Sequence, residues 1–341
     1  MTLIALLGGC TSTSVTEKYQ DKRNDIINVK DKVIEFETGN VLIGSVSRLY
    51  MSNKCLLIAD HKSVDKQIHI FNKNDFSYLT SIGNFGEGPE EITVMGCLAI
   101  DEAHHQLYVS DHAKQKIFSY DMDSVMVDSL YKPQVKTAMN ETLFPSEYQY
   151  INDTLSIAVL IKPTSTSTFN QFLGRWNMNT GEMIPMKYTH PDIQKKRITF
   201  AASEKAGIYV ECYTRHDLMT ICSLDGELLY NIYGPDWDGG NGNKLQSFGT
   251  VMIGNDKIFV SYCGEDYARD SFPTKILVFD LEGNYLKTLE TGYKISDCCY
   301  DSFNNRIILS LNDVVQFAYL DIDGIISVSY THLRAHETTL H

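Results

Sequence analysis

Six short apolar segments recur along the chain at nearly constant spacing, and this repeat restricts the possible fold more than any other feature. They begin 48 to 53 residues apart, and each is rich in β-branched and aromatic residues. Segments this short do not form helices and are typical of buried strands. A period near 50 residues with several strands per unit indicates a β-propeller, so six units predict six blades. The six segments are Leu56–Asp60, Leu107–Asp111, Leu155–Val159, Ile208–Cys212, Ile258–Tyr262 and Ile307–Leu311.

Each unit also contains a second strand-like segment followed by a tight turn rich in Asn, Asp and Gly. These residues accept the positive φ angles that two-strand turns require. An inner strand precedes the first segment, as at Cys97–Asp101, and a weaker outer strand follows the turn. Each unit is therefore predicted to supply four antiparallel strands. The turns are Asn72–Asp75, Asp121–Ser124, Met178–Gly181, Leu224–Glu227, Leu281–Asn284 and Asp321–Gly324.

The sixth unit has no convincing outer strand after its turn, whereas Asp31–Gly39 is strand-like and precedes the first blade. We therefore predict that Val33–Glu37 serves as the outer strand of blade six and closes the ring. Closure of this kind removes exposed strand edges. The predicted architecture is an all-β, six-bladed propeller over residues 31–326.

The charge of the chain excludes several classes of partner. The formal net charge is −13, and no cluster of Lys and Arg is longer than Lys195–Arg197. Nucleic-acid binding depends on neutralising phosphates, so no nucleic acid is expected as a partner. Adsorption to anionic lipid is disfavoured for the same reason. No run of eighteen apolar residues is present, so no membrane-spanning segment is predicted.

The two ends of the chain depart from the repeat. Leu7–Cys10 resembles the lipobox of a bacterial lipoprotein signal, which implies that residues 1–10 are the remnant of that signal and that Cys10 carries the lipid. Residues 11–30 are polar and are predicted to form a tether that does not pack. Residues 327–341 resemble read-through of adapter or vector sequence and are predicted to be non-native. The three histidines of this tail are assigned no function; they are His332, His336 and His341.

Residues Ile82–Asp123 contain the most specific motif. They resemble an NHL-type repeat, with a glycine-rich loop ending in Pro89 and the strand Leu107–Asp111, and Leu57–Asp60 matches part of the same pattern. Together with the lipobox, the chain resembles the six-bladed, TolB-like propeller lipoproteins of Bacteroidetes-type bacteria. The resemblance implies a lipid-anchored protein of the bacterial cell envelope, in the outer membrane. It does not imply one activity, because functional sites vary within a fold.

Two glycine-rich loops could suggest a nucleotide or a cation. Gly83–Glu91 does not open a helix, so we interpret it as a turn between blades and not as a phosphate-binding loop. Gly234–Asn243 has some oxygen ligands of a calcium loop but lacks the required order and the closing Glu. No cofactor is predicted, and a structural Ca²⁺ at this loop is left open.

Acidic and histidine side chains recur where the second strand leaves its blade, at Asp60–His61, Asp111–His112 and Arg215–Asp217. They could bind a metal or transfer protons. Because they repeat at one blade position, we favour a structural role at the strand ends. His104 and His105 lie in a turn at the opposite end of a blade and are predicted to be solvated.

Cysteine usage gives no indication of zinc or of disulfides. Seven cysteines remain after Cys10, with no pair at the spacing of a zinc site or a redox motif. The seven are therefore predicted to be core residues.

The composition of the loops favours a non-catalytic binding module. The rim between blades four and five is predicted to carry the aromatic and cationic side chains that dominate recognition sites. The expected ligand is an envelope protein, a peptide or a glycan, and the protein is expected to be a monomer. The predicted ligand-binding residues are Tyr213, Arg215, Trp237, Tyr262 and Tyr267.

Two alternatives remain open. A lactonase- or esterase-like hydrolase would need a cation in the central channel to activate water, and Asp297 and Glu147 are the plausible ligands from the inner strands. An extracellular sensor domain is the second alternative, but no transmembrane or signalling segment supports it.

Overall fold

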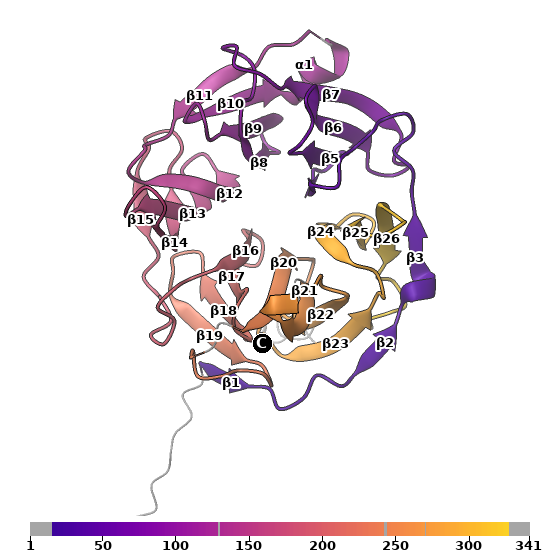
Figure 1. Ribbon diagram of the computed structural model, residues 1–341, viewed down its shortest axis with the longest axis vertical. Coiled ribbons are helices and arrows are strands. Elements are labelled where there is room, and N and C mark those ends of the chain that lie inside the picture. Colours follow the sequence, from indigo (N-terminus) through magenta and orange to yellow (C-terminus); the bar gives the residue numbers. More distant parts are fainter. Residues whose placement is uncertain (1–15, 129, 242–243, 270, 327–341) are drawn as a thin grey trace, which may run out of the picture.

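The computed structural model describes residues 16–326 except 129, 242–243 and 270. Six antiparallel sheets surround a central channel as the blades of a propeller, as Figure 1 shows. Blade 1 consists of β4 (Ser47–Met51), β5 (Cys55–Asp60), β6 (Lys66–Asn72) and β7 (Tyr78–Asn84). Blade 2 consists of β8 (Met95–Asp101), β9 (Gln106–Asp111), β10 (Lys116–Asp121) and β11 (Gln134–Ala138). Blade 3 consists of β12 (Phe144–Asn152), β13 (Leu155–Pro163), β14 (Phe169–Trp176) and β15 (Met183–Pro185).

The second half of the ring repeats this order. Blade 4 consists of β16 (Ile198–Ser203), β17 (Ile208–Tyr213), β18 (Leu218–Ser223) and β19 (Leu228–Tyr233). Blade 5 consists of β20 (Leu245–Ile253), β21 (Lys257–Asp266), β22 (Lys275–Asp280) and β23 (Tyr285–Glu290), with a short 3-10 helix, η2 (Tyr267–Arg269), between β21 and β22. Blade 6 consists of β24 (Ile295–Asp301), β25 (Arg306–Leu311), β26 (Phe317–Asp321) and β3 (Val33–Glu35). The predicted fold is confirmed, with four antiparallel strands in each blade.

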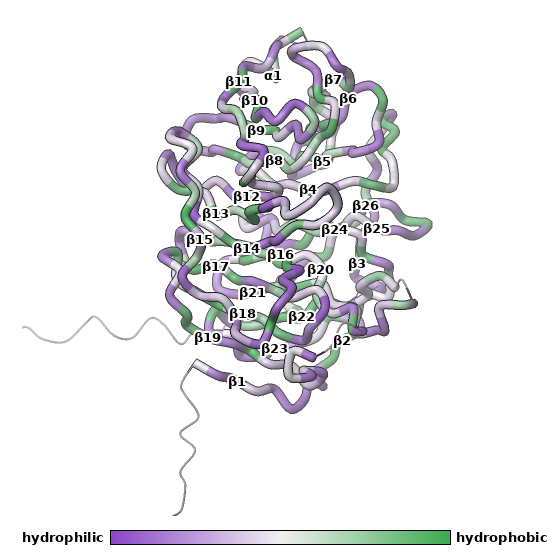
Figure 2. The backbone as a smooth tube through the Cα atoms, turned by 60° about the vertical axis from the view of Figure 1, so that its left-hand side comes forward, coloured by the Kyte–Doolittle hydropathy of each residue, from purple (hydrophilic) through white to green (hydrophobic). Residues whose placement is uncertain are grey.

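The hydrophobic core lies between blades and not at the centre of the ring. The described residues form six buried clusters, and each joins two neighbouring blades. All six residues of β5 are buried, because this strand is covered on both faces by adjacent blades. In Figure 2 hydrophobic stretches follow the strands, and many connecting loops are hydrophilic. This distribution leaves the inner strands free to line a channel.

The ring is closed by β3, as predicted. β3 pairs antiparallel with β26, with Val33 opposite Leu320 and Glu35 opposite Ala318. The strand is shorter than predicted, but the ring of Phe36 beyond it stacks on that of Phe76 with centroids 3.9 Å apart. This contact ties the closing segment to blade 1.

The prediction that residues 11–30 form an unpacked tether is wrong for the described part, residues 16–30. Two strands there, β1 (Glu17–Tyr19) and β2 (Ile26–Asn28), pair in parallel with the outer strands β19 and β23. A 3-10 helix, η1 (Lys30–Lys32), then leads into β3. In Figure 1 this indigo segment runs along the outer edges of blades 4, 5 and 6. The strands pair through backbone hydrogen bonds, and the buried Val29 packs in the hydrophobic core between blades 5 and 6.

A second difference concerns the turn predicted at Asp121–Ser124. The chain instead forms a short helix, α1 (Met122–Val127), because the Asp121 carboxylate accepts a hydrogen bond from the Ser124 N–H and caps its first turn. None of the described helices has the length and apolar character that a membrane span needs. Cys10 and residues 327–341 lie outside the described residues, as do the sequence predictions made for them.

Candidate functional site

The central channel is lined by residues from all six inner strands. Its inner cavity has a volume of about 370 Å³ and extends to the ends of these strands, at residues such as Ile100 and Ile151. A wider cavity of about 670 Å³ lies at the starts of the inner strands of blades 1, 4, 5 and 6, and we call it the wide mouth. Arg48, Thr250 and Asp297 line both cavities and therefore mark their junction.

An ion pair inside the channel joins two blades that are not adjacent. An Nη1 nitrogen of Arg48 in blade 1 lies 3.0 Å from Oε1 of Glu147 in blade 3. The two side chains are 38% and 42% exposed, so both are accessible to a molecule in the channel. Sequence analysis identified Glu147 but missed Arg48. The only signal for it was a basic residue inside the strand Ser47–Met51, and that signal does not show what the side chain faces.

Asp297 has a structural role beside this pair. Thr250 Oγ1 donates to one carboxylate oxygen at 2.7 Å, and the backbone N–H of Leu49 donates to the other at 2.8 Å. Burial raises the pKa of Asp297, while the nearby Arg48 guanidinium acts to lower it. Because both oxygens are bonded to neighbouring blades, Asp297 ties blades 5, 6 and 1 together.

The wide mouth combines apolar walls with polar groups, as ligand sites do. Its hydroxyl and amide groups come from several blades, and the ring of Phe272 adds an apolar surface. Small-ligand pockets typically have volumes of roughly 300–1,000 Å³ and combine apolar walls with a few polar groups. The partly or fully exposed polar residues at this mouth are Ser45, Arg48, Thr199, Gln246, Thr250, Ser296 and Asn312.

Two of the five predicted ligand-binding residues are in the wrong place for that role. Tyr213 is completely buried, and its hydroxyl donates to Glu211 at 3.1 Å. Tyr262 is 8% exposed, and its hydroxyl lies 3.5 Å from Asp217. Both rings pack between blades, so the prediction of an exposed rim position is wrong for both. The alternation of residues along a strand does not show which aromatic side chains the neighbouring blades bury.

The other three predicted residues gather at the rim of blades 4 and 5. The guanidinium carbon of Arg215 lies 3.0 Å from the ring centroid of Tyr267, whose side chain is half exposed. Trp237 is partly buried and packs against Tyr233 and His216, with ring centroids 5.0 and 6.0 Å apart. Arg215 follows β17 and Tyr267 follows β21, so the structure brings them together on the face of the wide mouth.

The recurring Asp–His motifs hold loops in place. A carboxylate oxygen of Asp60 accepts from the N–H of Gly44 at 2.7 Å, and Asp111 accepts from that of Thr93 at 2.8 Å. Burial lowers the pKa of both following histidines, His61 and His112. These contacts agree with the structural interpretation of the motifs. The seven described cysteines are buried and free, as expected for core residues.

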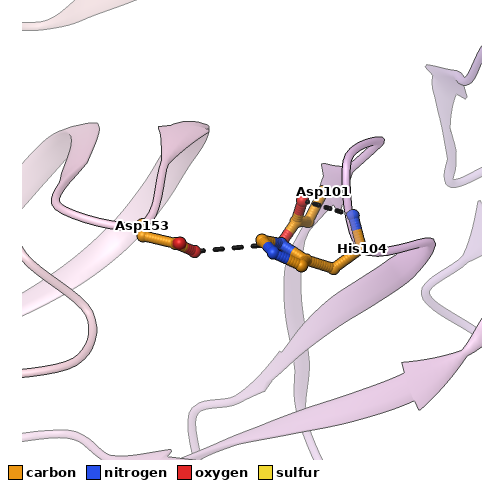
Figure 3. Close-up of side chains that lie close together, drawn as sticks. All are labelled: Asp101, His104 and Asp153. Carbon is orange, nitrogen blue, oxygen red and sulfur yellow. Dashed lines mark hydrogen bonds and ion pairs between the residues drawn. The ribbon is translucent and has the colours of Figure 1, made fainter.

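A second polar cluster lies on the face opposite the wide mouth. Asp101 is the last residue of β8 in blade 2, and His104 lies in the turn between β8 and β9. Asp153 lies in the turn between β12 and β13 of blade 3. Figure 3 shows both carboxylates directed at the imidazole. His104 Nδ1 lies 2.9 Å from Asp101 Oδ2 and 3.8 Å from Asp153 Oδ1. The hydrogen bond and charge of Asp101 raise the pKa of His104. His104 is exposed as predicted, but sequence analysis missed its two partners.

This cluster is the only group of three metal-ligating side chains among the residues described. Its ligand atoms all lie within 4.8 Å of one another. In the described part of the channel, Glu147 and Asp297 do not form such a group. The hydrolase alternative needs several ligands converging there, and the residues present do not fit a catalytic cation.

Comparisons with known proteins agree with the fold. A family model, DUF5128, described as a six-bladed β-propeller, matches residues 12–170. A Bacteroides fragilis protein described as exported has 14% sequence identity and a TM-score of 0.55, covering 86% of this chain and 87% of its own. A DUF4221 family member from Bacteroides vulgatus has 11% identity and the same TM-score, covering 88% of this chain and 98% of its own. No curated protein matches the sequence.

Proposed function

We propose that this propeller is a non-catalytic binding module of the bacterial cell envelope, which holds a peptide or glycan at the wide mouth of its channel. The observation that carries the proposal is the cavity of about 670 Å³ at this mouth, with the half-exposed Arg48 at its base. The cavity is large enough for a ligand, and its walls come from the inner strands of four blades together with the loops that adjoin them. The fold of a structural neighbour described as exported, together with the lipobox-like Leu7–Cys10, supports an envelope location with a lipid anchor at Cys10.

The chemistry of the mouth suits a polar, uncharged or weakly acidic group. A guanidinium carries five N–H donors, and one side-chain hydrogen bond of Arg48 goes to Glu147. The remaining donors suit carbonyl, hydroxyl or carboxylate oxygens of a ligand. Hydroxyl and amide groups around the rim bind peptide backbones and sugar hydroxyls, and Phe272 offers a surface for an apolar face. Arg215 and Tyr267 extend the same face outward and supply contacts for a larger partner.

The test compares two arginines in similar ion pairs. Arg48→Ala removes the channel cation, whereas Arg175→Ala removes an arginine that is 40% exposed and lies 3.0 Å from Asp225 at the outer part of blades 3 and 4. Wild-type protein is first screened against peptide and glycan libraries, and affinities for the ligands found are measured by calorimetry. We expect Arg48→Ala to weaken binding at least tenfold and Arg175→Ala to leave it unchanged.

Two results would oppose the proposal. Binding would have to lie elsewhere if Arg48→Ala, and a variant with Arg215 and Tyr267 changed to Ala, both bound the ligand with the affinity of the wild-type protein. Hydrolysis of esters or lactones by the purified protein, lost on chelation, would favour the enzyme alternative.

A further inference from the structure

We propose that Asp101, His104 and Asp153 form a binding site for a transition-metal dication such as Zn²⁺, which links blades 2 and 3 on the face opposite the wide mouth. This inference is independent of the ligand proposed above. The three side chains come from the end of one inner strand and from the turns that follow it and the adjacent inner strand. Because equivalent turns of neighbouring blades lie side by side, residues about one repeat apart in sequence can share one ion.

The distances between the ligand atoms suit one metal ion. A Zn²⁺ ion holds nitrogen and oxygen ligands at about 2.0–2.2 Å, so its ligand atoms lie roughly 3 to 4 Å from each other. His104 Nδ1 already lies 2.9 and 3.8 Å from the two carboxylate oxygens. Figure 3 shows the imidazole between the two carboxylates. The Asp153 side chain is 64% exposed and can move closer without disturbing packing. An imidazole with two carboxylates suits Zn²⁺ better than Mg²⁺ or Ca²⁺, which prefer oxygen ligands alone.

Both carboxylates are also oriented by tyrosine hydroxyls. Tyr108 donates to Asp101 Oδ2 at 3.2 Å, and Tyr150 donates to Asp153 Oδ1 at 2.7 Å. Outer hydrogen bonds of this kind fix the direction of metal-binding side chains. The backbone N–H of His104 donates to Asp101 Oδ1 at 3.1 Å and fixes the turn itself.

Blade 6 provides an independent argument, because it contains the same turn with a different charge balance. Asp301 there corresponds to Asp101, and Asn304 corresponds to His104, with Asn304 Nδ2 donating to the Asp301 carboxylate at 2.7 Å. Two cations neutralise the buried Asp301, since Lys73 Nζ and Arg306 Nε each lie 3.2 Å from it. The turn therefore requires neither an imidazole nor a second carboxylate.

Blade 2 lacks both of these cations. The register of the inner strand pair places Gln106 opposite Asp101, where blade 6 has Arg306 opposite Asp301. In the turn of the following blade, Met178 stands after Asn177 where blade 1 has Lys73 after Asn72. Asp101 is 1% exposed, and its ion pair within the described chain is with His104 alone. A buried carboxylate needs a compensating charge. His104 supplies that charge while it is protonated, and a dication bound to the neutral imidazole and to Asp153 would supply it instead.

The experiment uses full-length protein in which the three tail histidines are changed to Ala, because His332 and His336 could bind metal themselves. Zn²⁺ is titrated by calorimetry, and Co²⁺ is used as a spectroscopic probe of the ligand field. The key variant is His104→Asn, since Asn304 shows that Asn supports this turn in blade 6. The matched control is His105→Asn, which removes an exposed imidazole 2.7 Å from one carboxylate, Asp123.

We expect one Zn²⁺ per chain, with affinity reduced at least tenfold by His104→Asn and by Asp153→Asn and unchanged by His105→Asn. Zn²⁺ should also raise the melting temperature of the parent protein but not that of His104→Asn. Absence of saturable binding, or equal affinity in the parent and in both site variants, would overturn the proposal. Equal weakening by His105→Asn would also overturn it, because the metal would then be bound at the neighbouring exposed pair.

Discussion

Replacing Arg23 should destabilise the whole ring, although this residue lies in a segment predicted to be unpacked. Its Nη1 lies 2.7 Å from Asp217 Oδ1, and the two side chains are 7% and 0% exposed. Its guanidinium carbon also lies 5.5 Å from the ring centroid of Tyr262. The Arg23→Met variant keeps the apolar contact but leaves a buried carboxylate without its cation. Removing one partner of a buried ion pair costs about 3–5 kcal/mol.

For a chain of this size, that loss corresponds to a fall in melting temperature of roughly 4–7 °C. Scanning calorimetry of full-length protein measures it, with Lys22→Met as the control because the adjacent Lys22 is exposed. Asp217→Asn in the Arg23→Met background should recover part of the loss, since it removes the uncompensated charge. A melting temperature within one degree of the Lys22→Met control would refute the reasoning.

The loss should also depend on pH in a defined direction. Burial raises the pKa of Asp217, and the charge of Arg23 opposes that shift, so the pKa should rise further when Arg23 is removed. An acid whose pKa is higher in the folded state favours folding below its unfolded pKa of about 3.9, and that contribution is lost as pH rises through the folded value. The gap between wild type and Arg23→Met should therefore be large at neutral pH and should narrow toward pH 4. A gap that is constant across this range would contradict the assigned role of Asp217.

One deletion and two substitutions test the closure and the packing of the blades. Deleting residues 33–35 removes the closing strand and exposes the edge of β26. We expect a melting temperature lower by several degrees and aggregation detectable by light scattering. An unchanged melting temperature without aggregation would mean that the ring closes in another way. Gly234→Ala would place a methyl group against the buried Asp217 carboxylate. The free energy of unfolding, measured in urea, should fall by about 1–3 kcal/mol. An unchanged value would mean that this loop moves easily. Asp301→Asn leaves Lys73 buried without its counter-charge. The free energy of unfolding, measured with a chemical denaturant, should therefore fall by about 3–5 kcal/mol. A fall below about 1 kcal/mol would show that the contact between blades 1 and 6 does not depend on this ion pair.

The strand pattern could be predicted because it depends on short-range order. Segments such as Leu56–Asp60 are apolar on both faces because every blade is covered by two neighbours. This pattern can be recognised within the five residues of one such segment. The closing strand was predictable by elimination, because the last unit lacked its outer strand. The position of α1 was not, because Asp121 can cap either a turn or a helix.

The candidate sites depend on contacts between blades, which leave little trace in the sequence. Arg48 and Glu147 meet across the channel although they are 99 positions apart. Tyr213 and Tyr262 have the composition of recognition residues, but neighbouring blades bury them. In residues 16–30, apolar side chains such as Ile27 and Val29 are too few to indicate packing, yet the segment pairs with blades 4 and 5 and Val29 is fully buried.

The sequence by itself determined the number of blades, their strands and the closure of the ring, because repeated hydrophobic segments and turn residues act over a few positions. The tertiary structure alone decided which polar side chains meet. Asp101 and Asp153 lie about one repeat apart and face the same imidazole because adjacent blades place equivalent turns side by side. Arg23 reaches a buried carboxylate because backbone pairing, which is independent of side-chain type, holds its segment against the rim.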